Sequence, residues 1–503
     1  MSNATSKQSV REATKDQAWQ AKAIIDEIPT GVFIDGTWGD AASGRTTTVI
    51  NPATEQPIAT IADGGPKDAE RALKAAAAAQ AEWGRTAPRE RGEILRRAYE
   101  LMIERADELA TIMTSEMGKP LEEARGEVTY AAEFFRWFGE EAVRVRGDMT
   151  LSGDGKTRIF VSRQPVGPCV LVTPWNFPLA MGTRKIGPAI AAGCTMVFKP
   201  AHLTPLSSFA LVQILQEAGL PDGVLNVVCS SDAGSVVEPW LSSGIARKVS
   251  FTGSTGVGVK LLQQAAKHVL RSSMELGGNA PFIICQDADV DAAVEGLMVA
   301  KMRNMGEACT AANRIFVHRD VHDQVAEKLV DKMQSLVVGD GLATGVQTGP
   351  LVEEKALTKV TELVQDATDK GAEVLCGGTG YDGSGFFYAP TVLDDIPASA
   401  DIMREEIFGP VAPLIPYDDE DEMIALANGT PWGLMGYVYT ESVDRAFRLG
   451  ERIETGMVGL NTGLVSNPAA PFGGVKESGL GREGGAFGIE EFLEVKYLAL
   501  PRS

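Results

Sequence analysis

The segment Cys169-Val-Leu-Val-Thr-Pro-Trp-Asn-Phe-Pro178 joins a short apolar run to a loop of aromatic, amide and proline residues. From Gly167 onward the chain repeats this rhythm, and helical patterns such as Leu206–Ala218 and Gly258–His268 fill the gaps. Strands spaced by about one crossover helix indicate βαβ units and a parallel sheet, which is an α/β fold. The apolar runs lie at Cys169–Thr173, Cys194–Phe198, Val224–Val228, Lys248–Phe251 and Pro281–Cys285.

The loops after these runs are the first candidates for a ligand site. Parallel sheets bind ligands outside the carboxyl ends of their strands. We therefore expect Pro174–Pro178, Lys199–His202 and Thr252–Gly256 to lie at a site. A second α/β block follows, with strands expected at Ile315–His318, Glu373–Leu375, Thr391–Leu393, Val411–Pro416, Gly436–Tyr439 and Met457–Asn461.

The segments that flank the βαβ region have different residue patterns. Residues 1–29 are polar and weakly patterned, which predicts an extension or a loosely docked helix. Arg144–Val166 shows strand patterns around Gly153–Lys156, a hairpin signal, and the tail Phe492–Leu500 alternates like an added strand. Such a ribbon would suit an oligomerisation arm.

Charge and cysteine usage exclude several classes of protein. The 503 residues carry 47 Lys and Arg against 67 Asp and Glu, a formal charge of −20, which argues against nucleic acid or an anionic membrane as a partner. Six scattered cysteines make no disulfide framework and favour a reducing compartment. No secretory signal or membrane span is evident, so we expect a cytoplasmic protein. The four histidines offer no metal set, and His318 and His322 are expected at the surface.

One cysteine differs from the other five. Cys309 lies in Lys301–Arg314 among small residues, with Gly306, Ala308 and Thr310 close by. The others lie in or beside apolar runs, where a thiol usually behaves as a small buried hydrophobe. A nucleophile needs nearby backbone amides and room for a substrate carbon, which this segment provides.

Three further features carry possible chemistry, each with an ordinary alternative. Glu275, before a glycine pair, can be a surface residue beside a turn or a general base that deprotonates water. Asn176, in Trp-Asn-Phe-Pro, can be a turn residue or an oxyanion donor. Gly253–Gly258 suits phosphate at a helix N-terminus, but it lacks the dinucleotide-binding glycine spacing.

Taken together, five motifs resemble the aldehyde dehydrogenase superfamily from about residue 30 to the C-terminus. The motifs contain Cys309, Glu275 in Glu-Leu-Gly-Gly, Asn176 in Pro-Trp-Asn-Phe-Pro, Lys199 in Phe-Lys-Pro and Glu406 in Glu-Glu-Ile-Phe-Gly-Pro. The resemblance implies a Rossmann-like cofactor domain and a catalytic domain, each with a parallel sheet, and a β arm for oligomerisation. Its bounds here would be 30–142 with 166–277 for the cofactor domain, 278–477 for the catalytic domain, and 143–165 with 478–503 for the arm.

The resemblance also implies a role for each motif. The Cys309 thiolate would attack an aldehyde carbon, and the Asn176 amide and Cys309 backbone N–H would hold the resulting thiohemiacetal oxyanion. After hydride transfer, Glu275 would activate the water that hydrolyses the thioester. Since the histidines offer no metal set, we expect no metal ligand among the site residues. The resemblance implies a cofactor site formed by Thr173, Trp175, Lys199, Ala201, His202, Gly253, Ser254, Leu276, Glu406 and Phe408.

Three residues resemble the pattern of succinate-semialdehyde dehydrogenases, in which two arginines and a serine grip the distal carboxylate of the substrate. They are Arg184, Arg303 and Ser466. Paired guanidinium groups clamp a carboxylate through charge-assisted hydrogen bonds. The alternative is that both arginines are structural ion-pair partners. Glutarate semialdehyde, one methylene longer, would be hard to exclude.

Two departures from the family pattern bear on mechanism. NAD-preferring members often carry Glu three residues after the lysine, but this chain has His202, so the resemblance favours NADP over NAD. The family usually has Gln at the position of Glu307, and a carboxylate beside the thiol would raise the pKa of Cys309 unless it points away.

Two other classes of function remain open from the sequence. A cofactor-independent thioesterase or acyltransferase would need Cys309 and Glu275 but not Lys199 or Glu406. A non-catalytic structural role is also compatible with a reused fold. The resemblance implies a homodimer or homotetramer acting on a small aldehyde with a distal carboxylate.

Overall fold

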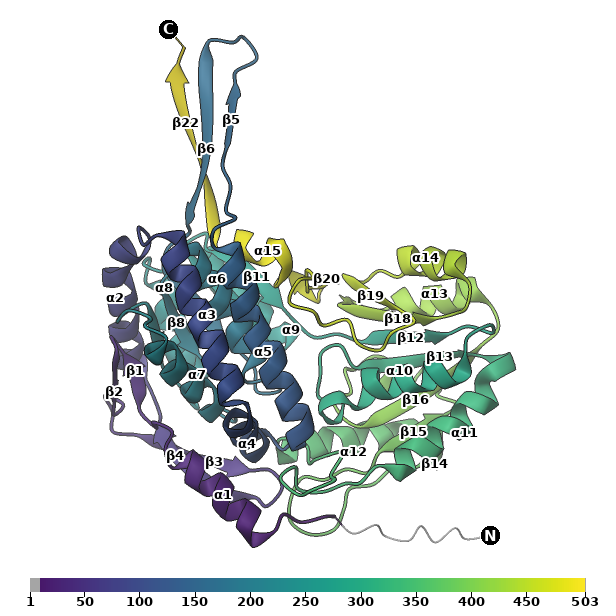
Figure 1. The fold of residues 1–503 in the computed structure, drawn as a ribbon. Coiled ribbons are helices and arrows are strands. Elements are labelled where there is room, and N and C mark those ends of the chain that lie inside the picture. The colour runs from purple at the N-terminus through teal and green to yellow at the C-terminus, as the bar shows by residue number, and fades with distance from the viewer. Residues whose placement is uncertain (1–9, 503) are drawn as a thin grey trace.

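The computed structural model describes residues 10–502, which form two mainly parallel β-sheets with helices around them and a projecting three-stranded arm (Figure 1). The first sheet has eight strands in the order β2-β1-β9-β8-β7-β10-β11-β21. Its strands are β1 (Val32–Ile34), β2 (Thr37–Gly39), β7 (Cys169–Val172), β8 (Met196–Lys199), β9 (Leu225–Val227), β10 (Lys248–Thr252), β11 (Arg271–Glu275) and β21 (Gly479–Leu480).

The five strands from β7 to β11 run parallel. The first four predicted apolar runs are confirmed as β7, β8, β9 and β10, but β11 was not among them, and the fifth run, Pro281–Cys285, forms a strand of the second sheet instead. Every residue of β7, β8, β9 and β10 is buried, because helices cover both faces of the sheet. The crossover helices are α6 (Ala180–Ala192), α7 (Leu206–Glu217), α8 (Ala233–Ser242) and α9 (Thr255–Ala266). The order reverses between β7 and β10, so the loops after these two strands meet at a topological switch point.

Helices from the N-terminal part of the chain surround this sheet. They are α1 (Lys15–Ile25), α2 (Pro66–Trp83), α3 (Pro88–Glu104), α4 (Ala106–Met117) and α5 (Leu121–Glu141). The predicted docked helix before residue 29 is confirmed as α1, which buries Ala21 and Ile25, while residues 1–9 lie outside the described part of the chain. The strands β3 (Thr46–Asn51) and β4 (Gln56–Ala62) form a small antiparallel hairpin.

The second sheet contains seven strands in the order β14-β15-β16-β13-β12-β18-β19. All are parallel except β14, which pairs antiparallel with β15. The strands are β12 (Ala280–Ile284), β13 (Ala312–His318), β14 (Glu373–Cys376), β15 (Thr391–Asp394), β16 (Val411–Tyr417), β18 (Met435–Tyr439) and β19 (Met457–Leu460). The helical elements of this half are α10 (Val290–Met302), η1 (Arg303–Gly306), α11 (Arg319–Ser335), α12 (Glu354–Asp369), η2 (Asp401–Met403), α13 (Glu420–Asn428) and α14 (Val443–Arg452).

The arm extends away from both sheets and ends at the C-terminus (Figure 1). It consists of β5 (Asp148–Leu151), β6 (Thr157–Pro165) and β22 (Leu493–Pro501), and β22 pairs with β6 along its full length. The segment just before β22 belongs to the body instead, since β21 closes the first sheet and α15 (Gly485–Glu490) contacts α5 and α6. The strands β17 (Trp432–Gly433) and β20 (Val475–Lys476) form a further two-stranded antiparallel sheet.

Two further structural observations concern membrane-spanning helices and the position of His322. No helix among residues 10–502 combines the length and apolar character needed to cross a membrane. The expectation that His322 lies at the surface is wrong: its side chain is buried, and its Nε2 lies 3.0 Å from Asp394 Oδ1 on β15. A neighbouring carboxylate satisfies the imidazole nitrogen that burial removes from water.

Candidate active site

The site forms where the two sheets join. Glu275 ends β11 and Ala280 begins β12, so the glycine pair Gly277-Gly278 connects one sheet directly to the other. A side chain at position 278 would place its Cβ 2.7 Å from the carbonyl oxygen of Cys309, so only glycine fits this approach. The linker therefore brings the Glu275 and Cys309 segments together.

Cys309 is partly exposed, whereas the other five cysteines are buried. It lies between η1 and β13, after two residues with left-handed backbone, Asn304 and Met305, that turn the chain sharply. Burial raises the pKa of the Cys309 thiol to about 12, and Arg184 counteracts part of this effect. In the resting protein this sulfur is a thiol that has to lose its proton before it can act as a nucleophile.

Asn176 reaches the cysteine segment from the loop after β7. Its side-chain Nδ2 donates a 2.9 Å hydrogen bond to the backbone carbonyl of Glu307, two residues before Cys309. A primary amide has two N–H groups, so one hydrogen remains for an oxyanion. The Asn176 side chain is buried, which fixes the donor without solvent competition.

Glu307 turns away from the thiol. Its Oε1 accepts a 3.2 Å hydrogen bond from the Val352 backbone N–H, on the side of the second sheet. Burial raises the pKa of Glu307 well above its ordinary range, so a neutral carboxyl group is favoured at this position. This orientation answers the question that the sequence raised about Glu307.

Glu275 is almost completely buried, and neither carboxyl oxygen has a hydrogen-bond partner among residues 10–502. Burial raises its pKa well above the ordinary value, and the nearby Glu483 adds to this effect. The backbone of Gly473 lies beside Glu275 Oε1, because a Cβ on that glycine would come within 2.9 Å. A buried carboxyl group with an elevated pKa can exchange a proton with water near neutral pH.

A buried charge cluster missed by the sequence reasoning adjoins Glu275. Glu483 forms an ion pair with Arg184 at 2.7 Å and another with Lys185. Burial opposes ionisation of Glu483, but Lys185 and Arg184 outweigh it and lower the pKa of this carboxyl. Arg184 also lies over the Phe472 ring at 4.0 Å. Nothing in the sequence around Glu483 pointed to Arg184 as its partner.

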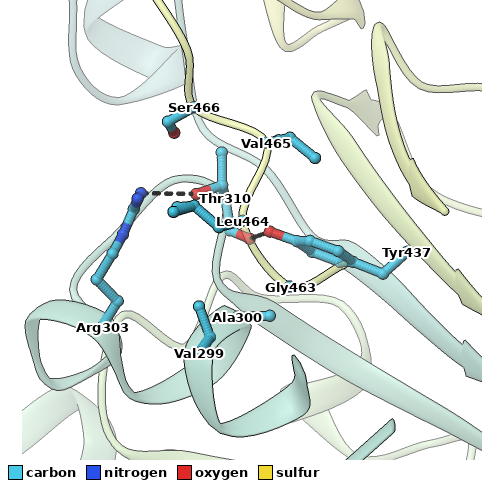
Figure 2. Close-up of a pocket in the computed structure, with 9 residues that line it drawn as sticks. All are labelled: Val299, Ala300, Arg303, Thr310, Tyr437, Gly463, Leu464, Val465 and Ser466. Carbon is cyan, nitrogen blue, oxygen red and sulfur yellow. Dashed lines mark hydrogen bonds between the residues drawn. The ribbon is translucent and has the colours of Figure 1, made fainter. Parts of the chain in front are cut away.

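The predicted carboxylate-binding residues fall into two situations. Arg184 is already paired, as the structural alternative expected, although the pKa of Cys309 shows that the two side chains interact. Arg303 has no ion pair among residues 10–502; its Nη2 donates to Thr310 Oγ1 at 3.4 Å and its guanidinium lies over the Phe177 ring. Arg303, Thr310 and Ser466 line one pocket, with Arg303 and Ser466 entering it from different segments (Figure 2).

The residues expected to hold a cofactor gather around the carboxyl ends of β7, β8 and β10. Lys199 ends β8, and His202 in the following loop interacts with it and with Lys355 on α12. Burial lowers the pKa of His202 and both lysines lower it further, while the Asp63 carboxylate opposes them. Three cationic or potentially cationic groups are therefore brought together on a protein whose net charge is −20.

The remaining predicted cofactor residues surround the same region. The Trp175 and Phe408 rings meet edge to face at 5.5 Å, and Glu406 Oε1 accepts from the Gly278 N–H at 3.1 Å. Burial raises the pKa of Glu406 to about 7. Leu276 touches Gly258 of α9, where an added Cβ would lie 2.5 Å from its side chain.

These residues suit a dinucleotide. The Thr173 hydroxyl is buried without a partner in the described part of the chain, and Ala201, two residues after Lys199, is also buried. Gly253 and Ser254 lead into α9, and the Ser254 side chain does not cap that helix, so its first N–H groups remain available to an anion. Unpaired donors, cations and flat aromatic rings are the groups that a nicotinamide dinucleotide requires.

Comparisons with known proteins agree with this geometry. The Aldehyde dehydrogenase family profile matches residues 38–498. A succinate-semialdehyde dehydrogenase of Paenarthrobacter nicotinovorans is 55% identical, over 88% of this chain and 98% of its own. A glutarate-semialdehyde dehydrogenase of Pseudomonas putida is 50% identical, over 93% of this chain and 97% of its own. The crystal structure of an NADP-dependent enzyme from Escherichia coli superposes with a TM-score of 0.93 at 48% identity, covering 94% of this chain and 98% of the other. The chain therefore belongs to the aldehyde dehydrogenase family.

Proposed function

We propose that this protein oxidises succinate semialdehyde to succinate with NADP as the preferred acceptor and NAD as the alternative. The overall reaction consumes an aldehyde, the oxidised cofactor and water, and yields a carboxylate, the reduced cofactor and two protons. The observation that carries the substrate assignment is Arg303, a guanidinium without an ion pair in residues 10–502 that shares a pocket with Ser466 and with the neighbour of the nucleophile, Thr310. Two relatives named for semialdehydes with a distal carboxylate support it.

In this mechanism Cys309 loses its proton and its sulfur forms a bond to the aldehyde carbon. The carbonyl oxygen becomes an oxyanion, which the free N–H of Asn176 and the Cys309 backbone N–H stabilise. Arg184 favours the thiolate because its positive charge lowers the pKa of Cys309 against the larger effect of burial. A bound nicotinamide dinucleotide would supply the hydride acceptor, and loss of hydride from the tetrahedral carbon would leave a thioester on the Cys309 sulfur.

Glu275 then removes a proton from water, and the resulting hydroxide attacks the thioester carbon. The C–S bond breaks, and the carboxylate product leaves. Glu275 has to ionise for this step, so the burial that raises its pKa makes it a stronger base once it is deprotonated. Lys199 and Glu406 would hold the cofactor riboses, and His202 with Lys355 would face a 2′-phosphate, which would raise the pKa of His202.

A substrate panel tests the assignment. We expect the parent to favour succinate semialdehyde over butanal, which has the same carbon chain without the carboxylate. Arg303→Ala should reduce kcat/KM for succinate semialdehyde about ten-fold or more and leave butanal almost unchanged. Arg319→Ala, which removes an exposed arginine, is the control. Equal loss for both aldehydes would contradict the assignment.

Glutarate semialdehyde is the second candidate substrate, because one additional methylene changes binding only modestly. It belongs in the same panel. A cofactor-independent thioesterase is the less favoured class, since it would leave the Lys199 and Glu406 arrangement without a purpose. Hydrolysis of activated thioesters by the parent without cofactor, with no absorbance change at the wavelength of the reduced cofactor, would favour that class.

We also propose a function for each segment of the chain and an oligomeric state for the protein. Segments 30–142 and 166–277 bind the cofactor, and 278–477 carries the nucleophile. Segments 143–165 and 478–503 serve assembly into a homodimer or homotetramer, the latter through β22, since the residues before β22 pack on the body. Exposed apolar side chains on β5 and β22 support the arm's role: Met149, Leu151, Val495, Tyr497, Leu498 and Leu500. Light scattering of the parent and of a form lacking residues 493–503 tests it. The six free cysteines favour the cytoplasm as the location.

A further inference from the structure

Tyr130 on α5 presents an unused hydroxyl group to the same region. The hydroxyl is buried and makes no geometrically acceptable hydrogen bond within residues 10–502. Its ring meets the Phe134 ring edge to face at 5.0 Å, and Phe134 in turn contacts the Arg184 guanidinium. Positions 130 and 134 lie one helical turn apart, so α5 fixes the phenol in place. A buried donor without a partner is rare in proteins and calls for an explanation.

The surroundings of this hydroxyl define what it can bind. Arg184, Arg303 and Ser466 all interact with the phenol and lower its pKa, against the larger effect of burial, which raises it. Guanidinium groups donate hydrogen bonds and accept none, so neither arginine can satisfy a phenol donor. The Ser466 hydroxyl is able to accept, but no hydrogen bond joins it to the phenol in the part of the chain that the structure describes. Glu483, an acid whose charge acts on the phenol, is already bound by Arg184 and Lys185.

An anion that enters the pocket from outside would supply the missing acceptor. A carboxylate has two oxygens with about four acceptor positions, enough for one guanidinium, one serine hydroxyl and one phenol. Arg303 and Ser466 already line the pocket from α10–η1 and from the segment after β19 (Figure 2). Tyr130 would approach the same ligand from α5, a third element.

We propose that Tyr130 is a specificity-determining residue that donates its hydroxyl hydrogen to the distal carboxylate of the aldehyde, together with Arg303 and Ser466. This inference rests on the proposed function. It predicts that Tyr130 contributes to the recognition of acidic aldehydes and contributes nothing to the reaction at the aldehyde carbon.

The test compares the parent with Tyr130→Phe, which removes one oxygen atom. With NADP present, kcat/KM for succinate semialdehyde should fall about ten-fold or more, as expected for a hydrogen bond to a charged group. The value for butanal should change less than about two-fold, because butanal has no carboxylate and the substitution removes only a contact with that group. Tyr388→Phe is the matched control, because it also removes a buried hydroxyl without a partner, in a different core cluster.

The outcomes separate this inference from the proposed function. A parent that does not prefer succinate semialdehyde to butanal overturns both. A parent with that preference, matched by an equal preference in Tyr130→Phe, overturns only the role of Tyr130. As a second measurement that does not require turnover, succinate should raise the melting temperature of the parent more than that of Tyr130→Phe. Equal shifts would also overturn the role.

Discussion

Lys119 Nζ donates a 2.8 Å hydrogen bond to the backbone carbonyl of Asn176, so a buried cation holds the loop that carries the proposed oxyanion donor. The same ammonium group forms an ion pair with Glu127, and both side chains are 1% exposed. Glu127 in turn accepts from the backbone N–H groups of Leu179 and Ala180, at the start of α6. The pair therefore fixes the Asn176 loop from behind and the following helix at its first turn.

Removing one member of this pair should be costly. Lys119→Ala leaves Glu127 as an uncompensated buried charge, and we expect the free energy of unfolding to fall by about 3–5 kcal/mol. Chemical denaturation measures the change. Lys22→Ala breaks an exposed helical pair with Asp26 and should cost less than about 1 kcal/mol. Similar values for the two variants would show that the buried pair does not hold the loop.

Asn176→Ala should remove the amide half of the oxyanion site. We expect kcat to fall about 10²–10³-fold, the usual loss for one such donor. The rate at which iodoacetamide alkylates Cys309 should change little, because alkylation forms no oxyanion at that position. A variant with unchanged kcat would assign Asn176 to the alternative, a turn residue whose amide only supports the Glu307 carbonyl.

The pKa of Cys309 makes a prediction about pH. Because burial raises it to about 12, the thiolate fraction of the cofactor-free protein should rise about ten-fold for each pH unit between 7 and 10. The rate of alkylation, measured at a series of pH values, reports that fraction. The Cys309→Ser variant gives the background rate from the five buried thiols. A rate that levels off below pH 8 would mean that the thiolate already exists in the resting protein.

His202 offers a test of cofactor preference. His202→Glu places a carboxylate where a 2′-phosphate would lie, so the ratio of kcat/KM for NADP to that for NAD should fall about ten-fold or more through charge repulsion. The control is His268→Glu, which makes the same exchange at an exposed position after the far end of α9. An unchanged ratio would remove His202 from the phosphate site.

The parts of the fold that local pattern determines were predictable. The apolar run at Cys169–Thr173 became β7, and the hairpin signal at Gly153–Lys156 became the turn between β5 and β6. The order of strands was not predictable, because pairing of β1 with β9 and of β21 with β11 joins segments far apart in the chain. Periodicity reports which face of a segment is buried, but not its neighbour.

The same distinction holds for the site. The contrast between Cys309 and the five buried cysteines was visible in the residues around each thiol. The pairing of Lys185 with Glu483 was not, since 298 positions separate the two residues. The prediction that His322 is exposed was wrong for the same reason. Its partner, Asp394, lies on a strand far away in the sequence. Tyr130 gave no signal at all, since its significance depends on which groups surround its hydroxyl.

The most direct test of the account is the covalent bond to Cys309. Glu275→Gln should allow acylation but block the water attack, so mixing it with succinate semialdehyde and NADP should give one burst of reduced cofactor and then almost no turnover. Mass spectrometry of the digested protein should then find a succinyl group on the peptide that contains Cys309. A burst without any adduct, or an adduct on another residue, would contradict the central role of this sulfur.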